Sequence, residues 1–250
     1  LLTKSASFGF VGGTVANGPA AWPVAVIVRG RRARFGSDDG AARSSATGDV
    51  TLDAHLRSVG ERASQFASLM GLDTELADAV TLAGRFHDLG KADPRFQALL
   101  RGGPLWLAES YGSDAFDLLA KSTVASGSMS ELNASSWPVG YRHEAVSLAL
   151  VEAADDSLFE GVDRGLVEHL VASHHGHARP LFPARADGAP AKVSVTFDSV
   201  DWSASSEESH PAWSQPRRFS DLCERYGEWG LALLEATVRL ADISISEEGR

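Results

Sequence analysis

Histidine and aspartate side chains recur along this chain on or beside the apolar faces of its helical patterns. The first pair, His87-Asp88, ends an apolar run in the segment GRFHDLGKADPRF. A His-Asp pair alone is a weak signal, because a histidine on an apolar helix face is more often a hydrogen-bonded core residue than a metal ligand. The other candidates lie on separate expected helices and are His55, His143, the pair His174-His175 and Asp242.

These side chains can do metal chemistry if the fold brings them together. Buried imidazole and carboxylate groups cost free energy unless they are paired or bind a metal ion. Ligands that project inward from several helices of a bundle form such sites. The pattern therefore predicts a polynuclear metal site inside a helical bundle.

The elements that would position the first candidates are helices with clear boundaries. Apolar residues repeat at helical spacing over residues 52–70, and Gly71 follows as a C-cap. A second helix is expected over residues 74–90, with His87 on its apolar stripe. An Asp-Pro pair then predicts the start of a short helix over residues 94–100.

The remaining candidates fall on later helices. Helical spacing resumes at His143 and again over residues 166–174. A last helix is expected over residues 220–246, and Asp242 projects from its buried side. His169 is placed at the polar edge of its helix, and no role is assigned to it.

The fold class predicted from these patterns is all-α, a helical bundle with a small β appendage. Residues 1–36 are interpreted as a β-hairpin appendage and residues 37–50 as a polar linker. Residues 102–140 and 178–218 are interpreted as two loop insertions. The first contains one possible helix at 115–120, and the second contains an alternating run that could be a strand.

Composition limits the possible functions. The chain has 250 residues, of which 44% are hydrophobic, so it can bury a sizeable core. A formal net charge of −10 argues against broad adhesion to a polyanion, although bound metal ions can attract phosphates locally. The single cysteine, Cys223, rules out a disulfide framework. With no signal peptide or membrane span visible, we expect a cytoplasmic protein that does not enter a membrane.

The sequence resembles the HD nuclease domain of the CRISPR type I helicase-nuclease, within the HD phosphohydrolase superfamily. The resemblance covers about residues 51–248 and runs through LDAHLRSV, HDLGK, YRHE, HHGHARP and LADISIS. The HHG triplet followed by Arg-Pro is typical of the CRISPR domains. The resemblance implies that residues 51–250 form an HD nuclease domain.

Carried over to this chain, the resemblance implies a site for two divalent ions. The first ion would be held by His55, His87, Asp88 and Asp242. The second would be held by Asp88, His143, His174 and His175, so that Asp88 bridges both ions. Imidazole and carboxylate ligands suit manganese, iron, cobalt, nickel or zinc better than magnesium. Two ions about 4 Å apart can activate water and stabilise the leaving oxygen of a phosphodiester.

Two cationic residues beside these motifs have alternative interpretations. Lys91, one turn past His87, would face the scissile phosphate, or it caps the C-terminus of a helix. Arg179 matches the arginine of its motif and would contact phosphate, or it holds its loop in place.

The function implied by the resemblance is cleavage of single-stranded DNA in CRISPR interference, together with an effector complex and a helicase. No ATP-binding loop is present, because the segment from Gly84 to Lys91 has five residues between its glycines and Ala92 where Ser or Thr should follow. The helicase is therefore expected elsewhere, on the same polypeptide or another one. An HD nucleotide phosphohydrolase and a non-catalytic metal-binding module are the alternatives, and retention of every ligand speaks against the second.

Overall fold

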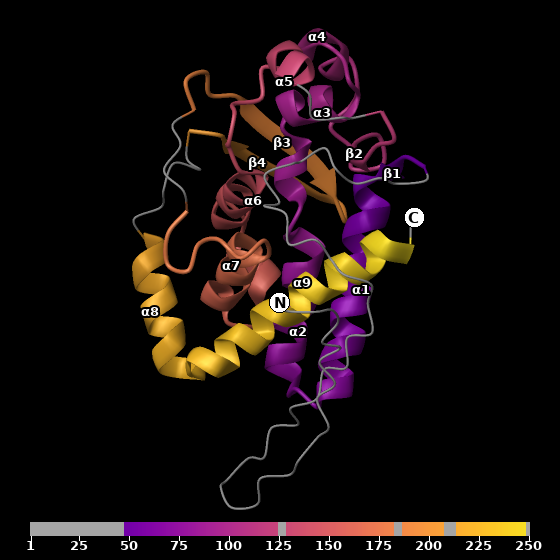
Figure 1. Cartoon of the computed structure of the whole chain (residues 1–250). Helices are drawn as coiled ribbons and strands as arrows, with labels where there is room; N and C mark the ends of the chain where they lie inside the picture. Colours follow the sequence, from indigo (N-terminus) through magenta and orange to yellow (C-terminus); the bar gives the residue numbers. More distant parts are fainter. Residues whose placement is uncertain (1–47, 125–128, 183–186, 208–213, 249–250) are drawn as a thin grey trace, which may run out of the picture. The chain divides into compact units, whose positions relative to one another are not determined.

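The computed structural model describes residues 48–124, 129–182, 187–207 and 214–248. Within these ranges the chain is mostly helical, with two small two-stranded sheets, which confirms the predicted all-α class (Figure 1). The β-hairpin predicted for residues 1–36 falls outside the described residues, as does most of the predicted linker. The domain boundaries therefore stay predictions.

The first two helices begin and end as the sequence predicts. Helix α1 spans Leu52–Met70, and the Thr51 side chain accepts a hydrogen bond from its first turn. Gly71 then ends α1 with a φ of 68°, a left-handed conformation that glycine adopts without strain. Helix α2 spans Thr74–Phe86, shorter than predicted, with Asp73 as its N-cap.

Helices α1 and α2 pack closely because glycines face each other where they meet. A Cβ built on Gly84 would lie 3.1 Å from the Cα of Gly60, so a larger residue at Gly84 would push the two helices apart. This close approach brings His55 of α1 beside His87, the residue that directly follows α2. The two imidazole rings are 5.3 Å apart between centroids.

A tight 3-10 turn follows α2 and connects it to the next helix. This turn, η1, spans Leu89–Ala92, and α3 spans Pro94–Leu100 with the predicted Asp93 as its N-cap. Gly90 of η1 packs directly against α6, and its N–H donates a hydrogen bond of 2.8 Å to the Ser147 hydroxyl oxygen.

Two further helices pack around α2 and the turn that follows it. Helix α6 spans His143–Glu152, the short turn η2 spans Asp156–Phe159, and α7 spans Arg164–Ser173. Both α6 and α7 are buried along most of their length, and α7 packs against both α2 and α6. Their ends carry His143 and His174 toward the turn that follows α2.

The first predicted insertion contains a strand where the sequence predicts a helix. It holds α4 (Leu105–Ala108), β2 (Leu119–Lys121) and α5 (Met129–Ser135). The helix predicted at 115–120 is wrong, because β2 pairs with β1 (Val50–Thr51) in an antiparallel sheet. The Gln97 side chain also bonds both the N–H and the carbonyl of Leu119, which fixes this backbone as extended.

The second predicted insertion contains the expected strand and a partner for it. Strand β3 (Lys192–Phe197) pairs with β4 (Val200–Ser205) through a two-residue turn. Both turn residues, Asp198 and Ser199, have positive φ, as tight hairpin turns require. The alternating apolar residues of β3 face the core.

The last predicted helix is two helices. Helix α8 spans Ser214–Tyr226 and α9 spans Glu228–Glu248, and Gly227 lies between them with a φ of 72°. The prediction of one helix was wrong because apolar residues continue at helical spacing across this glycine. Helix α9 packs on α1 and α2 (Figure 1). Its Asp242 lies beside His55 of α1. Among the described residues, no helix is both long and apolar enough to cross a membrane.

Replacing Gly90 with alanine tests the contact between η1 and α6. The new Cβ would lie 2.1 Å from the His143 carbonyl oxygen and 2.6 Å from the Ser147 backbone nitrogen. Because these are backbone atoms of a buried helix, we expect the free energy of unfolding to fall by about 1–3 kcal/mol in urea denaturation. Gly188→Ala is the control, since nothing lies within 4 Å of its added Cβ. Wild-type stability in Gly90→Ala would contradict the close packing.

Candidate metal centre

Asp88 lies between two groups of side chains that could each hold a metal ion. It directly follows His87 at the end of α2, and its side chain is almost fully buried. We call the first group, His55, His87, Asp88 and Asp242, the His55 cluster. We call the second group, Asp88, His143, His174 and His175, the His143 cluster. The structure thus brings all of the predicted ligands together around one carboxylate.

The His55 cluster gathers around one oxygen of Asp88. The Nε2 atoms of His55 and His87 lie 3.1 Å and 3.2 Å from Asp88 Oδ2. Asp242 approaches from α9, with its Oδ1 atom 3.3 Å from His55 Nε2 and 3.9 Å from His87 Nε2.

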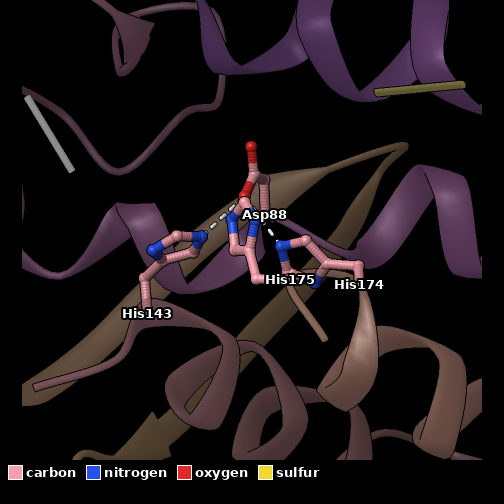
Figure 2. A group of neighbouring side chains, drawn as sticks. All are labelled: Asp88, His143, His174 and His175. Atoms are coloured by element: carbon pink, nitrogen blue, oxygen red, sulfur yellow. Dashed lines mark ion pairs between the residues drawn. The ribbon is translucent and has the colours of Figure 1, made fainter. Parts of the chain in front are cut away.

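The His143 cluster gathers around the other oxygen. The Nε2 atoms of His143 and His174 lie 3.0 Å and 3.7 Å from Asp88 Oδ1 (Figure 2). The ring of His175 lies 4.2 Å from that of His174 and 5.1 Å from that of His143, between centroids. Each carboxylate oxygen of Asp88 therefore faces a different cluster.

Backbone carbonyls fix the protonation of two of these rings. His87 Nδ1 lies 2.8 Å from the Gly84 carbonyl oxygen, and His174 Nδ1 lies 2.7 Å from the Val171 carbonyl oxygen. A carbonyl oxygen can only accept, so each Nδ1 carries the hydrogen and donates it. In the neutral ring, Nε2 is then left with a bare lone pair directed at Asp88, as a metal ligand requires.

Several polar atoms of the site have no hydrogen-bond partner among the described residues although they are buried. They include Asp88 Oδ1 and the Nε2 atoms of His55, His87, His143 and His174. Buried polar atoms normally have a partner, because leaving one without costs free energy. That these atoms converge from separate helices fits divalent metal ions, which bind imidazole nitrogen and carboxylate oxygen.

The charges of the site keep its carboxylates ionised. Burial alone raises the pKa of Asp88, but the neighbouring His87, Lys91, His143 and His55 together hold it well below its ordinary value. Burial likewise raises the pKa of Asp242, and the neighbouring imidazoles of His55 and His87 outweigh it, so the net shift is strongly downward.

Burial favours the neutral form of two of the histidines. Burial is the largest influence on His143 and His174, and it lowers the pKa of both rings, that of His174 strongly. Ionised carboxylates and neutral imidazoles are the protonation states in which these groups bind metal ions.

Comparison with known protein families identifies the family to which this chain belongs. Residues 41–241 match the family described as "Cas3, HD domain". The chain belongs to this family. Comparisons with curated proteins and with solved structures gave no match. Membership makes the chain a metal-dependent hydrolase of the HD type, which agrees with the two clusters that could hold metal ions.

Lys91 lies at the edge of the Cas3 HD site. Its ammonium is 2.6 Å from Asp88 Oδ2 and donates a hydrogen bond of 3.4 Å to the Ala120 carbonyl oxygen of β2. The cation is therefore placed beside the carboxylate that the two clusters share.

Arg179 and His169 belong to a polar network behind the site. Arg179 Nε lies 3.1 Å from Glu235 Oε2, a contact that favours the alternative in which Arg179 holds its loop in place. His169 is fully buried, so its predicted place at a polar helix edge is wrong. Its Nε2 lies 2.7 Å from Glu235 Oε1, and Gln215 donates to its Nδ1. Helices α8 and α9 cover this face of α7, which the prediction of one helix did not anticipate.

The sequence analysis missed Glu144, a buried carboxylate directly behind the His143 cluster. Its Oε1 accepts two hydrogen bonds from Arg142, at 2.9 Å and 2.7 Å. Its Oε2 lies 3.6 Å from His143 Nδ1. Burial raises the pKa of Glu144, but the neighbouring His143, His175 and Arg142 outweigh burial and lower it. The glutamate next to the histidine in YRHE was the available signal.

Replacing Asp88 with alanine tests its place between the clusters. Because each of its oxygens faces a different cluster, we expect the variant to lose both ions and all hydrolytic activity. Metal analysis of the purified protein measures the first effect, and far-UV circular dichroism checks that the helices remain. A variant that kept two ions per chain and normal activity would show that Asp88 does not bridge the two ions.

Proposed function

We propose that this Cas3 HD chain is a nuclease that cleaves single-stranded DNA. The observation that carries the proposal is the division of the Asp88 carboxylate between two clusters of buried histidines. One carboxylate that serves two neighbouring clusters is the arrangement expected of a site that hydrolyses phosphodiesters with two ions.

The two clusters supply the ligands for two divalent transition-metal ions. In this proposal the His55 cluster holds one ion, and the His143 cluster holds the other. The candidates are manganese, iron, cobalt, nickel and zinc, because the ligands combine imidazole with carboxylate. When bound, such a pair supplies a nucleophile from water at neutral pH and stabilises the oxygen that leaves phosphorus.

The exposed side of the site indicates where the substrate binds. Side chains of His87 and His174 are 0% exposed, whereas those of Lys91 and Asp242 are 12% and 16% exposed. We infer that the scissile phosphate approaches past Lys91 and Asp242. The Lys91 ammonium would donate a hydrogen bond to a non-bridging phosphate oxygen and orient it toward Asp88.

A single DNA strand fits this recessed site better than a duplex does. A flexible strand can bend one phosphate down to ligands inside a helical bundle, whereas a stiff duplex cannot. The chain carries no ATP-binding loop, so strand separation would come from a helicase on the same or another polypeptide. We therefore place the activity in CRISPR type I interference, with an effector complex and a helicase as partners.

The metal preference follows from the ligand set, which has five imidazoles and two carboxylates. Manganese, cobalt or nickel should support a faster reaction than magnesium or calcium, because the hard ions prefer all-oxygen sites. The measurement is the cleavage rate of a chelator-treated sample supplied with each ion in turn. Full activity with magnesium alone would mean that the ligand set is wrong.

The substrate is tested by offering labelled single-stranded DNA, duplex DNA and nucleoside triphosphates with manganese present. We expect cleavage of the single strand, independent of base sequence and weaker as salt rises, because the strand is held by its phosphates. Asp88→Ala, purified in parallel, controls for contaminating nucleases. Preferential hydrolysis of the triphosphates would favour a nucleotide phosphohydrolase, and no hydrolysis at all would favour a non-catalytic module.

A further inference from the structure

Asp242 is the least enclosed carboxylate of the metal site. Its side chain is 16% exposed, against 2% for Asp88. It also lies farther from the histidines it shares with Asp88, at 3.3 Å and 3.9 Å compared with 3.1 Å and 3.2 Å. A carboxylate in this position needs other contacts to keep one orientation.

Ser246 provides such a contact from the same helix. It lies four residues after Asp242 on α9, and its hydroxyl donates a hydrogen bond of 3.1 Å to Asp242 Oδ1. Side chains at this spacing lie on the same face of a helix. The serine therefore contacts the same oxygen that faces His55 and His87.

Lys121 of β2 continues this chain of hydrogen bonds. Its ammonium donates to the Ser246 hydroxyl oxygen, across 125 positions of sequence. An ammonium has only hydrogens to donate and a carboxylate can only accept, so the direction from Lys121 through Ser246 to Asp242 is fixed. A hydroxyl that already accepts from a cation is a stronger donor to the carboxylate.

Lys121 is held in this position by elements that carry none of the predicted metal ligands. Strand β2 is held by β1 and by the Gln97 side chain, and the Lys121 residue is 8% exposed. Burying a lysine ammonium is costly unless it is hydrogen-bonded, so its position is specific. Its neighbour on β2, Ala120, also accepts a hydrogen bond from Lys91. One strand therefore contacts both exposed polar residues at the entrance of the site, directly or through Ser246.

We propose that Lys121 and Ser246 are positioning residues that hold the Asp242 carboxylate in place for the ion of the His55 cluster. This inference rests on the proposed function, since it assumes that the cluster binds an ion. It assigns a role to two residues outside the expected ligand set. It also explains why Ser246, four positions after Asp242 and half-buried on the same helix, is a polar residue.

The neighbouring Ser244 offers a matched control. It lies on the same helix, two residues from both Asp242 and Ser246, and it is also partly buried. Its hydroxyl oxygen accepts from Arg62, which also pairs with Glu248 at 2.8 Å. Ser244 therefore helps to attach α9 to α1 without touching the metal site.

The test compares manganese binding to the chelator-treated chain by titration calorimetry. We expect two ions to bind the wild-type chain. Ser246→Ala and Lys121→Met should weaken the binding of one ion by about 10- to 100-fold and leave the affinity for the other ion unchanged. Ser244→Ala should bind both ions as wild type does, and Lys121→Arg should retain most of the affinity. Excess manganese should restore kcat in Ser246→Ala, because the residue positions a ligand and does not react.

The outcomes separate this inference from the function on which it rests. A wild-type chain that bound no ion would overturn the proposed function and this inference with it. Two ions on the wild type and unchanged binding by Ser246→Ala would overturn the positioning role alone. If the variant bound both ions equally more weakly, or if Ser244→Ala lost the same affinity, the positioning role would also be overturned. Lys121 is buried, so if Lys121→Met does not fold, Ser246→Ala and Ser244→Ala still decide the question.

Discussion

The site depends on one ionised carboxylate buried between two groups of histidines. Each oxygen of Asp88 faces one group, and within the described part of the chain no other residue belongs to both. An unpaired buried carboxylate would be costly, so the arrangement requires cations or hydrogen-bond donors on both sides. The bundle supplies part of this requirement through the Lys91 ammonium. In the proposed function, metal ions supply the rest.

The surrounding fold places the histidines around Asp88 through close backbone packing. Glycines let α1 and α2 approach until His55 and His87 meet, and Gly90 lets η1 lie directly on α6 beside His143. The hydrogen bond that each of His87 and His174 makes to a carbonyl three residues earlier orients its ring before any ion binds. Ligand geometry is thus set by backbone contacts, which reduces the cost of ordering the site on binding.

Local patterns in the sequence were sufficient to predict the candidate ligands and most of the helices that hold them. Caps and apolar spacing predicted α1 and α3 closely, and the His and Asp positions followed from those helices. Contacts between distant segments could not be predicted in this way. The apolar residues around Leu119 suit a helix, and only pairing with β1 and Gln97 makes them a strand. The contact between Lys121 and Ser246 has the same origin, because it depends on where that strand lies.

The central claim is that Asp88 joins two ions held by the two clusters. Crystals of the chain grown with manganese, measured at the manganese absorption edge, test it most directly. We expect two anomalous peaks about 4 Å apart, one in each cluster, with one Asp88 oxygen bound to each. A single peak, or two peaks of which only one contacts Asp88, would contradict it.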